Sequence, residues 1–573
     1  MSPNQVIVLA TPVFLLLIAL EFWIGVRRGR NTYRLADTLN SVGLGMLSRI
    51  TDVFSLALRL GIYVWVQDHA ALWRHDGFWT SPAGWVLALV FYDFLYYWNH
   101  RLGHEVGVFW AAHVVHHQSQ HYNLSTALRQ PSTYPLLGWV FYLPMALAGV
   151  PPLVFAVVGL IDLLYQFWIH TEQIGSMGRF DRWFASPSNH RVHHAVNNRY
   201  LDKNYGGVLM LWDHLFGTFE AEDPKEPCIY GTRKPLQSWD PVWANAEVYA
   251  GLARDSARSQ RWGDRLRTWI RPPGWRADDV ATRWPVAPFD LAAVQRFDPP
   301  AARAVQGLAA LMFVALLGGV AFFLWTADAR GTLSNLAWAA ALLAVLWAQG
   351  ALLQGRLGVG EVLMVGSATL ATLGAAEGWI ELHRVFKPLT MLVAIGLVLR
   401  SDVRGKGWLL AALTGSLAGD AFLMFEGFFI PGLASFLFAH IAYTLRFRLD
   451  APWLPDRRAA LAVGAVGVVM YGVLWSGGLP EGLRVPVAAY VLAIALMASQ
   501  ALGRATLRGD PGSRRVAAGA LCFLLSDALL AIDRFVSPLA WSALGVLATY
   551  YIAQYLIVTG LLREPGRTPP QGA

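Results

Sequence analysis

Long apolar runs separated by short polar loops make up most of this 573-residue chain. A run of about 20 apolar residues is long enough for one helix to cross a bilayer. The runs lie near residues 5–26, 40–66 and 83–99, and then near 303–325, 334–352, 358–376, 386–400, 407–425, 428–446, 459–476, 485–502, 515–532 and 538–562. This pattern predicts an all-α, polytopic membrane protein in which these runs are the spanning helices.

Three further stretches do not follow the spanning pattern. Residues 134–170 are apolar but contain Pro144, Pro151 and Pro152, which predicts a tight helical hairpin, re-entrant or spanning. Residues 171–300 hold no long apolar run and are rich in Trp, Arg, Asp and Pro, so we expect them to form a polar cap. The Pro/Gly-rich end, residues 566–573, is expected to be a disordered tail.

The basic residues predict the orientation of the chain. Its composition is 55% hydrophobic and 15% charged, and the net charge of +8 comes from arginines in short loops between apolar runs. Such loops face the cytoplasm, which places Arg27–Arg34, the cap and the C-terminus there and predicts a multi-pass protein of a bacterial-type inner membrane. We find no nucleic-acid-binding motif. Because the positive charges follow the first run, we expect it to be retained rather than cleaved.

Histidines are concentrated in one part of the chain. Of the 15 His, 11 lie between His100 and His214, where even scatter would place roughly three. They form the motifs HxxxH, HxxHH and HxxHH, made by His100, His104, His113, His116, His117, His190, His193 and His194. Since positions i, i+3 and i+4 share a helix face, we expect each motif to aim its imidazoles at one point. Eight imidazoles could give two metal ions about four ligands each, and imidazole suits Fe, Zn, Cu and Ni.

The residues around these motifs include the strings NLSTALRQ, FWIHTE and DKNYGGVLMLWDHLFGTFE. They resemble the fatty acid hydroxylase/sterol desaturase superfamily, and within it the alkylglycerol monooxygenases. The resemblance implies a membrane-bound enzyme that uses two iron ions, O2 and a tetrahydropterin to cleave glyceryl ether lipids. It implies that the eight histidines are the iron ligands, and that His170 is a further ligand or a partner of one. The sequence does not identify the electron donor.

Other polar residues near the motifs are candidates for lesser roles. Glu105 directly follows His104 and could position the pterin or orient a ligand imidazole. Asn123 and Arg129 are candidates for substrate binding. His121 stands where the family pattern has no histidine, so we leave it out of the ligand set.

The sequence changes character after residue 380. The strings LTGSLAGDAF, AHIAYTL, LLSDALL and ATYYIAQY resemble the YhhN/TMEM86 family, whose characterised members include lysoplasmalogenases that hydrolyse vinyl ethers. Asp420 and Asp527 stand inside apolar runs, where a carboxylate is costly and marks a cavity or a partner. We therefore expect these two residues to be the catalytic pair of the second unit. Further polar groups inside the runs are substrate-binding candidates: His440, Tyr443, Tyr550 and Gln554. Lys387 could simply extend from a helix end towards water.

These observations predict four segments: a di-iron domain over residues 1–300, additional transmembrane helices over 301–380, a YhhN-like domain over 381–565 and the tail. The function predicted is a glyceryl ether monooxygenase fused to a vinyl ether hydrolase. One alternative is a hydroxylase or desaturase of sterols, carotenoids or fatty acids. A non-enzymatic alternative is a metal or proton transporter with His and Asp as its relay.

Overall fold

The computed structural model describes residues 2–74 and 76–564, so the predicted tail at 566–573 lies outside the described residues. Its elements are helical, and the only β pairing in the described chain is two isolated bridges. Ten of the described helices are long and apolar enough to cross a membrane. The all-α, polytopic prediction is therefore confirmed. The chain divides into two compact units, residues 1–329 with 349–356, and residues 330–348 with those from 357 onward.

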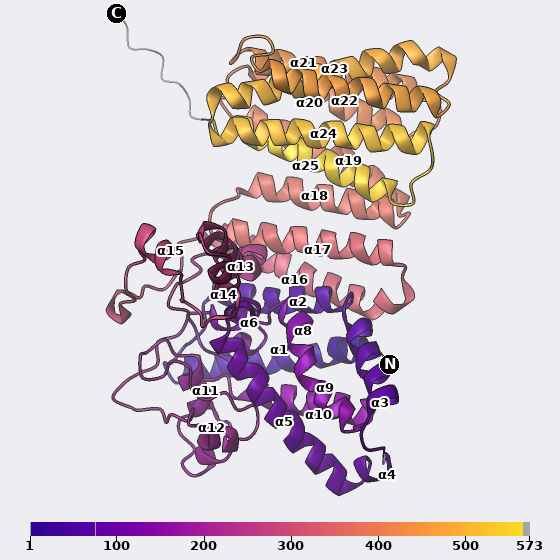
Figure 1. Cartoon of the computed structure of the whole chain (residues 1–573). Coiled ribbons are helices and arrows are strands. Elements are labelled where there is room, and N and C mark those ends of the chain that lie inside the picture. The colour runs from indigo at the N-terminus through magenta and orange to yellow at the C-terminus, as the bar shows by residue number, and fades with distance from the viewer. Residues whose placement is uncertain (1, 75, 565–573) are drawn as a thin grey trace, which may run out of the picture. The chain divides into compact units, whose positions relative to one another are not determined.

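The first unit contains the histidine motifs (Figure 1). Its longer helices are α1 (Pro3–Arg27), α2 (Leu35–Asp52), α3 (Leu56–Ala70), α5 (Pro82–Glu105), α10 (Pro152–Trp168) and α16 (Arg303–Thr326). The span expected over residues 40–66 consists of two helices, α2 and α3, which meet at a bend of 57° and are long and apolar enough only as a pair. The two helices break next to Asp52, which pairs with both Arg49 and Arg59. A helix end with such an ion-pair cluster is more polar than a continuous span.

The proline-rich hairpin is present. It consists of the short helices α8 (Tyr134–Gly138) and α9 (Leu143–Leu147), followed by α10. The turn between α9 and α10 passes through Gly149 with φ +80°, and a β carbon there would come within 1.9 Å of the Trp73 carbonyl oxygen. Glycine is thus required by both the backbone angle and the close approach.

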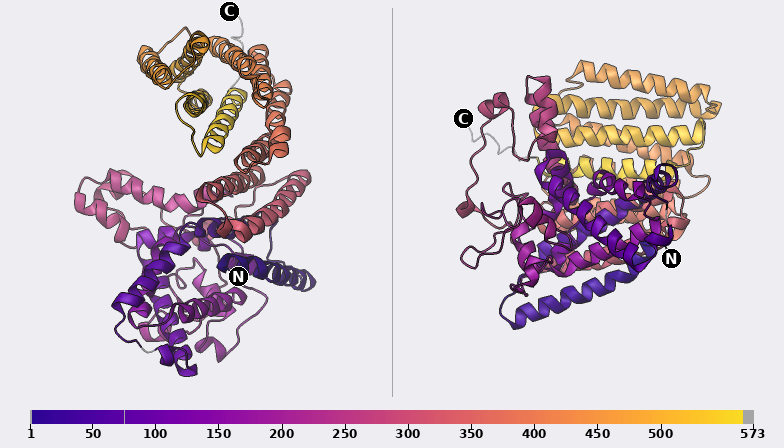
Figure 2. Two further views of the ribbon diagram at one scale, coloured as in Figure 1. Left: turned by 90° about the vertical axis from the view of Figure 1, so that its right-hand side faces the viewer. Right: turned by 60° about the horizontal axis from the view of Figure 1, so that its bottom comes forward.

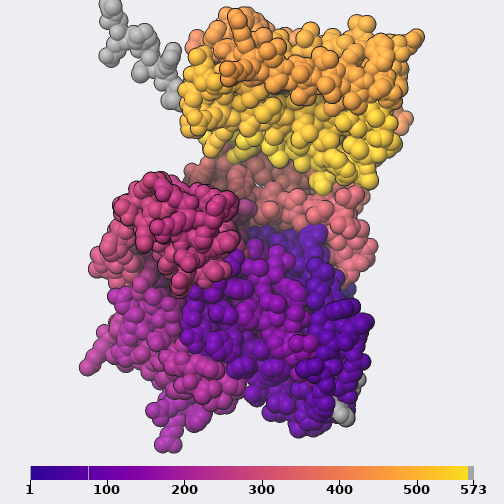
Figure 3. Space-filling view, in the orientation of Figure 1, coloured from indigo at the N-terminus to yellow at the C-terminus, as the bar shows by residue number. Residues whose placement is uncertain are grey.

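The polar segment after the hairpin begins with loops and two short helices and continues with the longer helix α13 and two further helices. Its helices are α11 (Pro187–His193), α12 (Leu211–Phe216), α13 (Pro241–Arg258), α14 (Trp262–Ile270) and α15 (Asp278–Arg283). Figure 3 shows α13 to α15 and their loops as a lobe on the surface of the first unit. The loop at residues 203–205 reaches the histidines, since Lys203 and Tyr205 accept hydrogen bonds from His193 and His100.

The second unit is a bundle of long helices that run side by side (Figure 2). They are α18 (Val359–Ala376), α19 (Ile380–Leu399), α20 (Lys406–Leu423), α21 (Phe429–Arg448), α22 (Arg457–Ser476), α23 (Glu481–Arg508), α24 (Pro511–Phe535) and α25 (Ser542–Leu562). Small residues permit the closest packing: a β carbon on Gly519 would lie 2.9 Å from the Ala553 carbonyl oxygen. Membrane helices associate through such small residues because lipid offers no hydrophobic drive between them.

The helices of the predicted segment 301–380 divide between the units. Helix α16 belongs to the first unit and α18 to the second, whereas the residues of α17 (Thr332–Leu353) are shared. Helix α18 packs mainly against α19 and α25, both of the second unit.

Candidate functional site: two histidine clusters and a polar cavity

Nine buried histidines of the first unit form two clusters. Within each cluster one ring nitrogen per histidine lies within 4.8 Å of the others. The first cluster contains His100, His104, His113, His117 and His193, and the second contains His116, His170, His190 and His194. All nine residues predicted from the sequence are brought together, and His170 is a full member. His121 is buried but lies outside both clusters.

The expectation that each motif aims at one point is confirmed for His100 and His104, which both join the first cluster, but is wrong for the two HxxHH motifs. His113 and His117 join the first cluster, whereas His116 joins the second. In the other HxxHH motif, His193 joins the first cluster and its two motif partners join the second. Consecutive helical residues point about 100° apart, so neighbours such as His116 and His117 cannot share a target. Each HxxHH motif therefore serves both clusters.

Local structure explains how the motifs are presented. His100 and His104 lie one turn apart near the end of α5, and His117 ends the 3-10 helix η1 (Val114–His117) that continues α6 (Gly107–His113). Helix α11 begins with a capping box, in which Ser186 accepts from the Asn189 amide, and with a proline at its first turn. Such a start fixes the helix that carries the last motif.

Backbone carbonyls orient four of the nine rings. The Nδ1 atoms of His100, His116, His170 and His193 lie 2.7–3.0 Å from the carbonyl oxygens of Tyr205, Arg129, Gln166 and Lys203, respectively. A carbonyl can only accept, so Nδ1 carries the proton and Nε2 is left with its lone pair. His104 differs, because its Nδ1 lies 3.9 Å from the carboxylate of Asp202.

The free ring nitrogens face one another as metal ligands would. The Nε2 atoms of His100, His104 and His193 are buried and have no hydrogen-bond partner. In the second cluster, the Nε2 of His170 lies 3.1 Å from that of His190 and 3.3 Å from that of His116. Burial lowers the pKa of His116 to about 4, so its imidazole is neutral at physiological pH. Neutral imidazoles converging on a point fit a metal ion, and the family and the donor set fit iron.

Glu105 lies beside this centre but on its more exposed side. Its carboxylate accepts a hydrogen bond of 2.9 Å from Arg101, one turn earlier on α5. Arg101 also donates to the hydroxyl of Tyr97. Glu105 directly follows His104 in the sequence, and its role in pterin binding stays a prediction.

Asn123 and Arg129 have partners within the protein frame. Asn123 caps the short helix α7 (Leu124–Ala127) and donates to the Thr32 carbonyl oxygen at 3.0 Å. Arg129 donates to the Val115 carbonyl oxygen at 2.7 Å and to Asn40 at 2.9 Å. Both side chains are buried, and neither lines the cavity that reaches the histidines. These contacts support the segments that carry the histidines, and substrate binding by the two residues stays a prediction.

A cavity of about 550 Å³ leads to the two clusters from the membrane helices of the first unit. It reaches His113 of the first cluster and His116 and His170 of the second. Most of its wall is apolar and comes from α1, α2, α3, α10 and α16. An apolar cavity that ends at a metal centre suits a lipid chain whose reactive carbon must reach that centre.

The cavity also contains polar residues that the sequence reasoning missed. Asp162 and Gln166 lie one turn apart on α10, and Asn99 precedes His100 on α5. Asp162 stands inside an apolar run, which is the same signal that identified Asp420 and Asp527.

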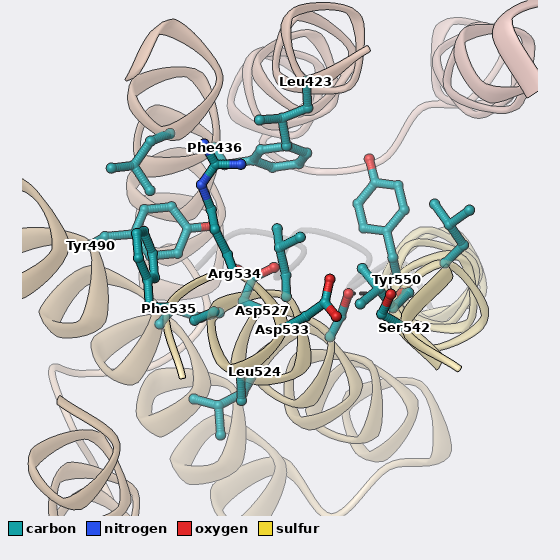
Figure 4. A pocket seen from close by; sticks show the side chains of 18 of the residues that line it. Leu423, Phe436, Tyr490, Leu524, Asp527, Asp533, Arg534, Phe535, Ser542 and Tyr550 are labelled. Atoms are coloured by element: carbon teal, nitrogen blue, oxygen red, sulfur yellow. Dashed lines mark hydrogen bonds between the residues drawn. The ribbon is translucent and has the colours of Figure 1, made fainter. Parts of the chain in front are cut away.

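In the second unit, Asp420 and Asp527 line one cavity of about 340 Å³. Figure 4 shows this cavity with Asp527, Tyr490 and Tyr550. Asp420 accepts a hydrogen bond of 2.6 Å from Tyr550 and lies 3.5 Å from the ammonium group of Lys387. Asp527 accepts a hydrogen bond of 2.6 Å from Tyr490, and His440 Nε2 lies 3.2 Å from the same oxygen. The structure thus brings both predicted aspartates together with His440 and Tyr550.

Three residues of the second unit differ from expectation. Tyr443 donates to Gln554, and Gln554 donates to Ser416 at 3.1 Å, so this chain of hydrogen bonds links α21, α25 and α20. Neither Tyr443 nor Gln554 lines the cavity. Lys387 does not extend towards water, because it is buried against Asp420. The sequence could not reveal this, since the two residues come from different helices.

Comparisons with known proteins agree with the two units. The fatty acid hydroxylase family model matches residues 85–218, and the YhhN family model matches residues 382–561. The chain is 44% identical to alkylglycerol monooxygenase of Homo sapiens over 46% of its own length and 59% of that protein. It is 35% identical to alkylglycerol monooxygenase of Xenopus tropicalis over 54% of its own length and 68% of that protein.

The C-terminal unit has a separate relative. It is 36% identical to lysoplasmalogenase TMEM86B of Sus scrofa over 31% of this chain and 75% of that protein. The chain spans little more than half the length of the first alkylglycerol monooxygenases it matches, 59% and 53%. No solved structure matches the chain.

Proposed function

Because the chain belongs to the alkylglycerol monooxygenases of the fatty acid hydroxylase family and carries a YhhN-family unit, we propose that it is a bifunctional membrane enzyme that degrades ether lipids. The first unit would oxidise saturated glyceryl ethers. The second would hydrolyse the vinyl ethers of lysoplasmalogens. Both reactions release a fatty aldehyde, which gives the fusion a common product.

The observation that carries the first activity is the apolar cavity that ends at both histidine clusters. The nine histidines would hold two iron ions, which supply the activation of O2 with a tetrahydropterin as reductant. One oxygen atom enters the C–H bond next to the ether oxygen, and the other leaves as water with two electrons and two protons from the reductant. The resulting hemiacetal splits into fatty aldehyde and glycerol.

The residues of the chain would hold the ligand imidazoles in fixed orientations and keep water away from the reacting carbon. The Nδ1 contacts with carbonyl oxygens hold the rings of His100, His116 and His193 in place before the substrate arrives. The apolar cavity excludes water and receives the alkyl chain. Nine histidines that converge on two points favour an oxygenase over a transporter, whose ligands would follow a path across the membrane.

The test of the first activity uses the purified whole chain. We expect about two iron ions per chain, and fatty aldehyde from an alkylglycerol only when O2 and tetrahydropterin are both present. His116→Ala should abolish this activity while membrane insertion persists. One stoichiometric zinc ion, or normal activity of His116→Ala, would contradict the proposal. Full turnover with ferredoxin or cytochrome b5 and no pterin would favour a sterol or fatty-acid hydroxylase instead.

The second activity rests on the two carboxyl groups that share one cavity. Hydrolysis of a vinyl ether begins with a proton transferred to carbon, and water then attacks the oxocarbenium ion. One acid and one base are needed, and different surroundings allow two carboxyl groups to divide these roles. Asp420 lies against Lys387 and Tyr550, whereas Asp527 lies against Tyr490 and His440.

Two nearly isosteric variants test this pair in the whole chain. Asp420→Asn and Asp527→Asn should both lose aldehyde release from lysoplasmalogen and keep the oxygenase activity. His116→Ala is the matched control, since it should lose the oxygenase activity and keep the hydrolase activity. If both Asn variants hydrolyse lysoplasmalogen at the normal rate, the two aspartates are not the catalytic pair.

We also propose that the protein lies in a bacterial-type inner membrane, with the arginine-bearing loops and the histidine clusters on the cytoplasmic side. Arg27, Arg28, Arg30 and Arg34 follow α1, and further arginines follow α19, α21, α23 and α25. The excess of Arg in these short loops supports this orientation.

A further inference from the structure

Asp162 is a buried carboxylate with one oxygen that no protein donor satisfies. It is 2% exposed and lies in the apolar helix α10. Its Oδ2 accepts a hydrogen bond of 2.6 Å from Gln166, but its Oδ1 has no hydrogen-bond partner. A buried acceptor without a donor is unfavourable, so a stable protein keeps one only where something else provides the donor.

The fold makes room for this carboxylate. A β carbon on Gly207 would come within 2.6 Å of Asp162 Oδ1 and within 2.8 Å of the ring of Tyr96. Any other residue at position 207 would therefore displace the carboxylate or the tyrosine. The position of Asp162 is thus determined by tight packing between α10, α5 and the loop that contains Gly207.

Asp162 lines the same cavity that ends at the metal clusters. Gln166, its hydrogen-bond donor, accepts a hydrogen bond of 2.7 Å from Tyr96, and the Gln166 backbone carbonyl orients His170. Helix α10, which carries Asp162 and Gln166, ends at Trp168, two residues before His170. Asn99, directly before His100, presents a second buried oxygen without a partner to this cavity.

We propose that Asp162, with Gln166 and Asn99 beside it, binds the free hydroxyl groups of the glycerol moiety of the substrate. This inference rests on the proposed oxygenase function. Each hydroxyl is a donor, and a carboxylate has enough lone pairs to accept from two hydroxyls at once. The alkyl chain then occupies the apolar part of the cavity, and the ether carbon lies between the polar groups and the histidines. Asp162 is therefore a specificity residue that selects polyol ethers.

The chemistry excludes other lipid head groups from this position. A fatty-acid carboxylate brings no hydrogen-bond donor that could satisfy the unpaired oxygens. A glyceryl ether whose hydroxyls are both acylated has no donor to offer. A long-chain ether with one or two free hydroxyls satisfies the unpaired oxygens without bringing a charge into the membrane helices.

A comparison of two substrates separates recognition from structural support. One substrate is an alkylglycerol with both hydroxyls free, and the other is the analogue that lacks the 2-hydroxyl. Each is tested with the whole wild-type chain, Asp162→Ala and Asp162→Asn, with kcat and KM measured separately. Iron per chain is measured in every sample. Asp93→Asn is the matched control, because Asp93 is also buried but accepts from the Val208 and Leu209 amides and lies outside the cavity.

We expect wild-type kcat/KM to favour the two-hydroxyl substrate by about 5- to 100-fold, the range for leaving one buried hydrogen-bonding group unpaired. Asp162→Ala should remove most of that preference, mainly through KM, with normal iron content. Asp93→Asn should keep the preference even if it lowers stability. The assignment would be overturned if Asp162→Ala kept the preference, or if its kcat/KM fell by the same factor for both substrates. A wild-type chain that cleaves neither ether would instead refute the proposed function.

Discussion

Arg129 offers the sharpest test of whether a residue supports the metal centre or binds the substrate. Its side chain is 1% exposed, and its guanidinium contacts the segment that carries His116 and His117. The backbone carbonyl of Arg129 also accepts from His116 Nδ1 at 3.0 Å. We expect Arg129→Ala to destabilise the first unit and to lower its iron content.

The magnitude follows from the contacts of the guanidinium. Nε donates to the Val115 carbonyl oxygen at 2.7 Å, Nη1 to Asn40 at 2.9 Å, and Nη2 to Gln118 at 3.3 Å. Burial lowers the pKa of Arg129 to about 10, so the group is still charged at neutral pH. Removing one member of a buried charged network typically costs about 3–5 kcal/mol. The alanine variant keeps the Arg129 carbonyl that orients His116, so its iron content should fall through displacement of the segment around Val115, which has lost the Arg129 side chain.

Three measurements decide the matter: iron per chain by elemental analysis, the midpoint of thermal unfolding in detergent, and KM for an alkylglycerol. Arg129→Ala should lower the first two and leave the KM of the iron-loaded fraction unchanged. Arg129→Lys keeps the charge but not the planar fork of donors, so its loss should be intermediate. Arg199→Ala is the surface control, because Arg199 pairs with Glu220 and Asp223 near the solvent, where such a pair contributes about 0–1 kcal/mol.

The opposite pattern would refute this reasoning. If Arg129→Ala raises KM by tenfold or more while iron content and the unfolding midpoint stay at wild-type values, Arg129 binds the substrate. The original expectation from the sequence would then be correct.

Three further predictions concern other parts of the chain. Glu105→Ala should weaken the use of tetrahydropterin more than it lowers iron content; an equal loss of both would make Glu105 a support of the iron site. A reporter at the C-terminus should lie in the cytoplasm and a tag after Pro480 outside it, and a C-terminal reporter found outside would contradict the predicted topology. Lys387→Met should abolish lysoplasmalogen hydrolysis and leave the oxygenase intact, because Asp420 loses the ammonium group that lies 3.5 Å from its carboxylate; normal hydrolysis would show that this ion pair is not needed.

Much of the architecture could be predicted from local sequence because its signals are local. An apolar run of spanning length reports a membrane helix wherever it occurs, and all ten runs expected after residue 300 are helices in the structure. The ligand histidines were identifiable for the same reason, since HxxxH and HxxHH are spacings within single helical turns. Asp420 and Asp527 were identifiable because a carboxylate in an apolar run is costly on its own.

Only the tertiary structure decided how these residues are grouped. The division of nine histidines into two clusters depends on where α5, η1 and α11 meet, and no spacing within one motif contains that information. Asp420 acquires Lys387 from α19, and Asp527 acquires His440 from α21. The side chains of Asn123 and Arg129 donate to backbone carbonyls of distant segments, whereas Asp162 lines the cavity. The sequence specifies the type of each side chain, but the partners of that side chain come from distant segments that meet only when the chain folds.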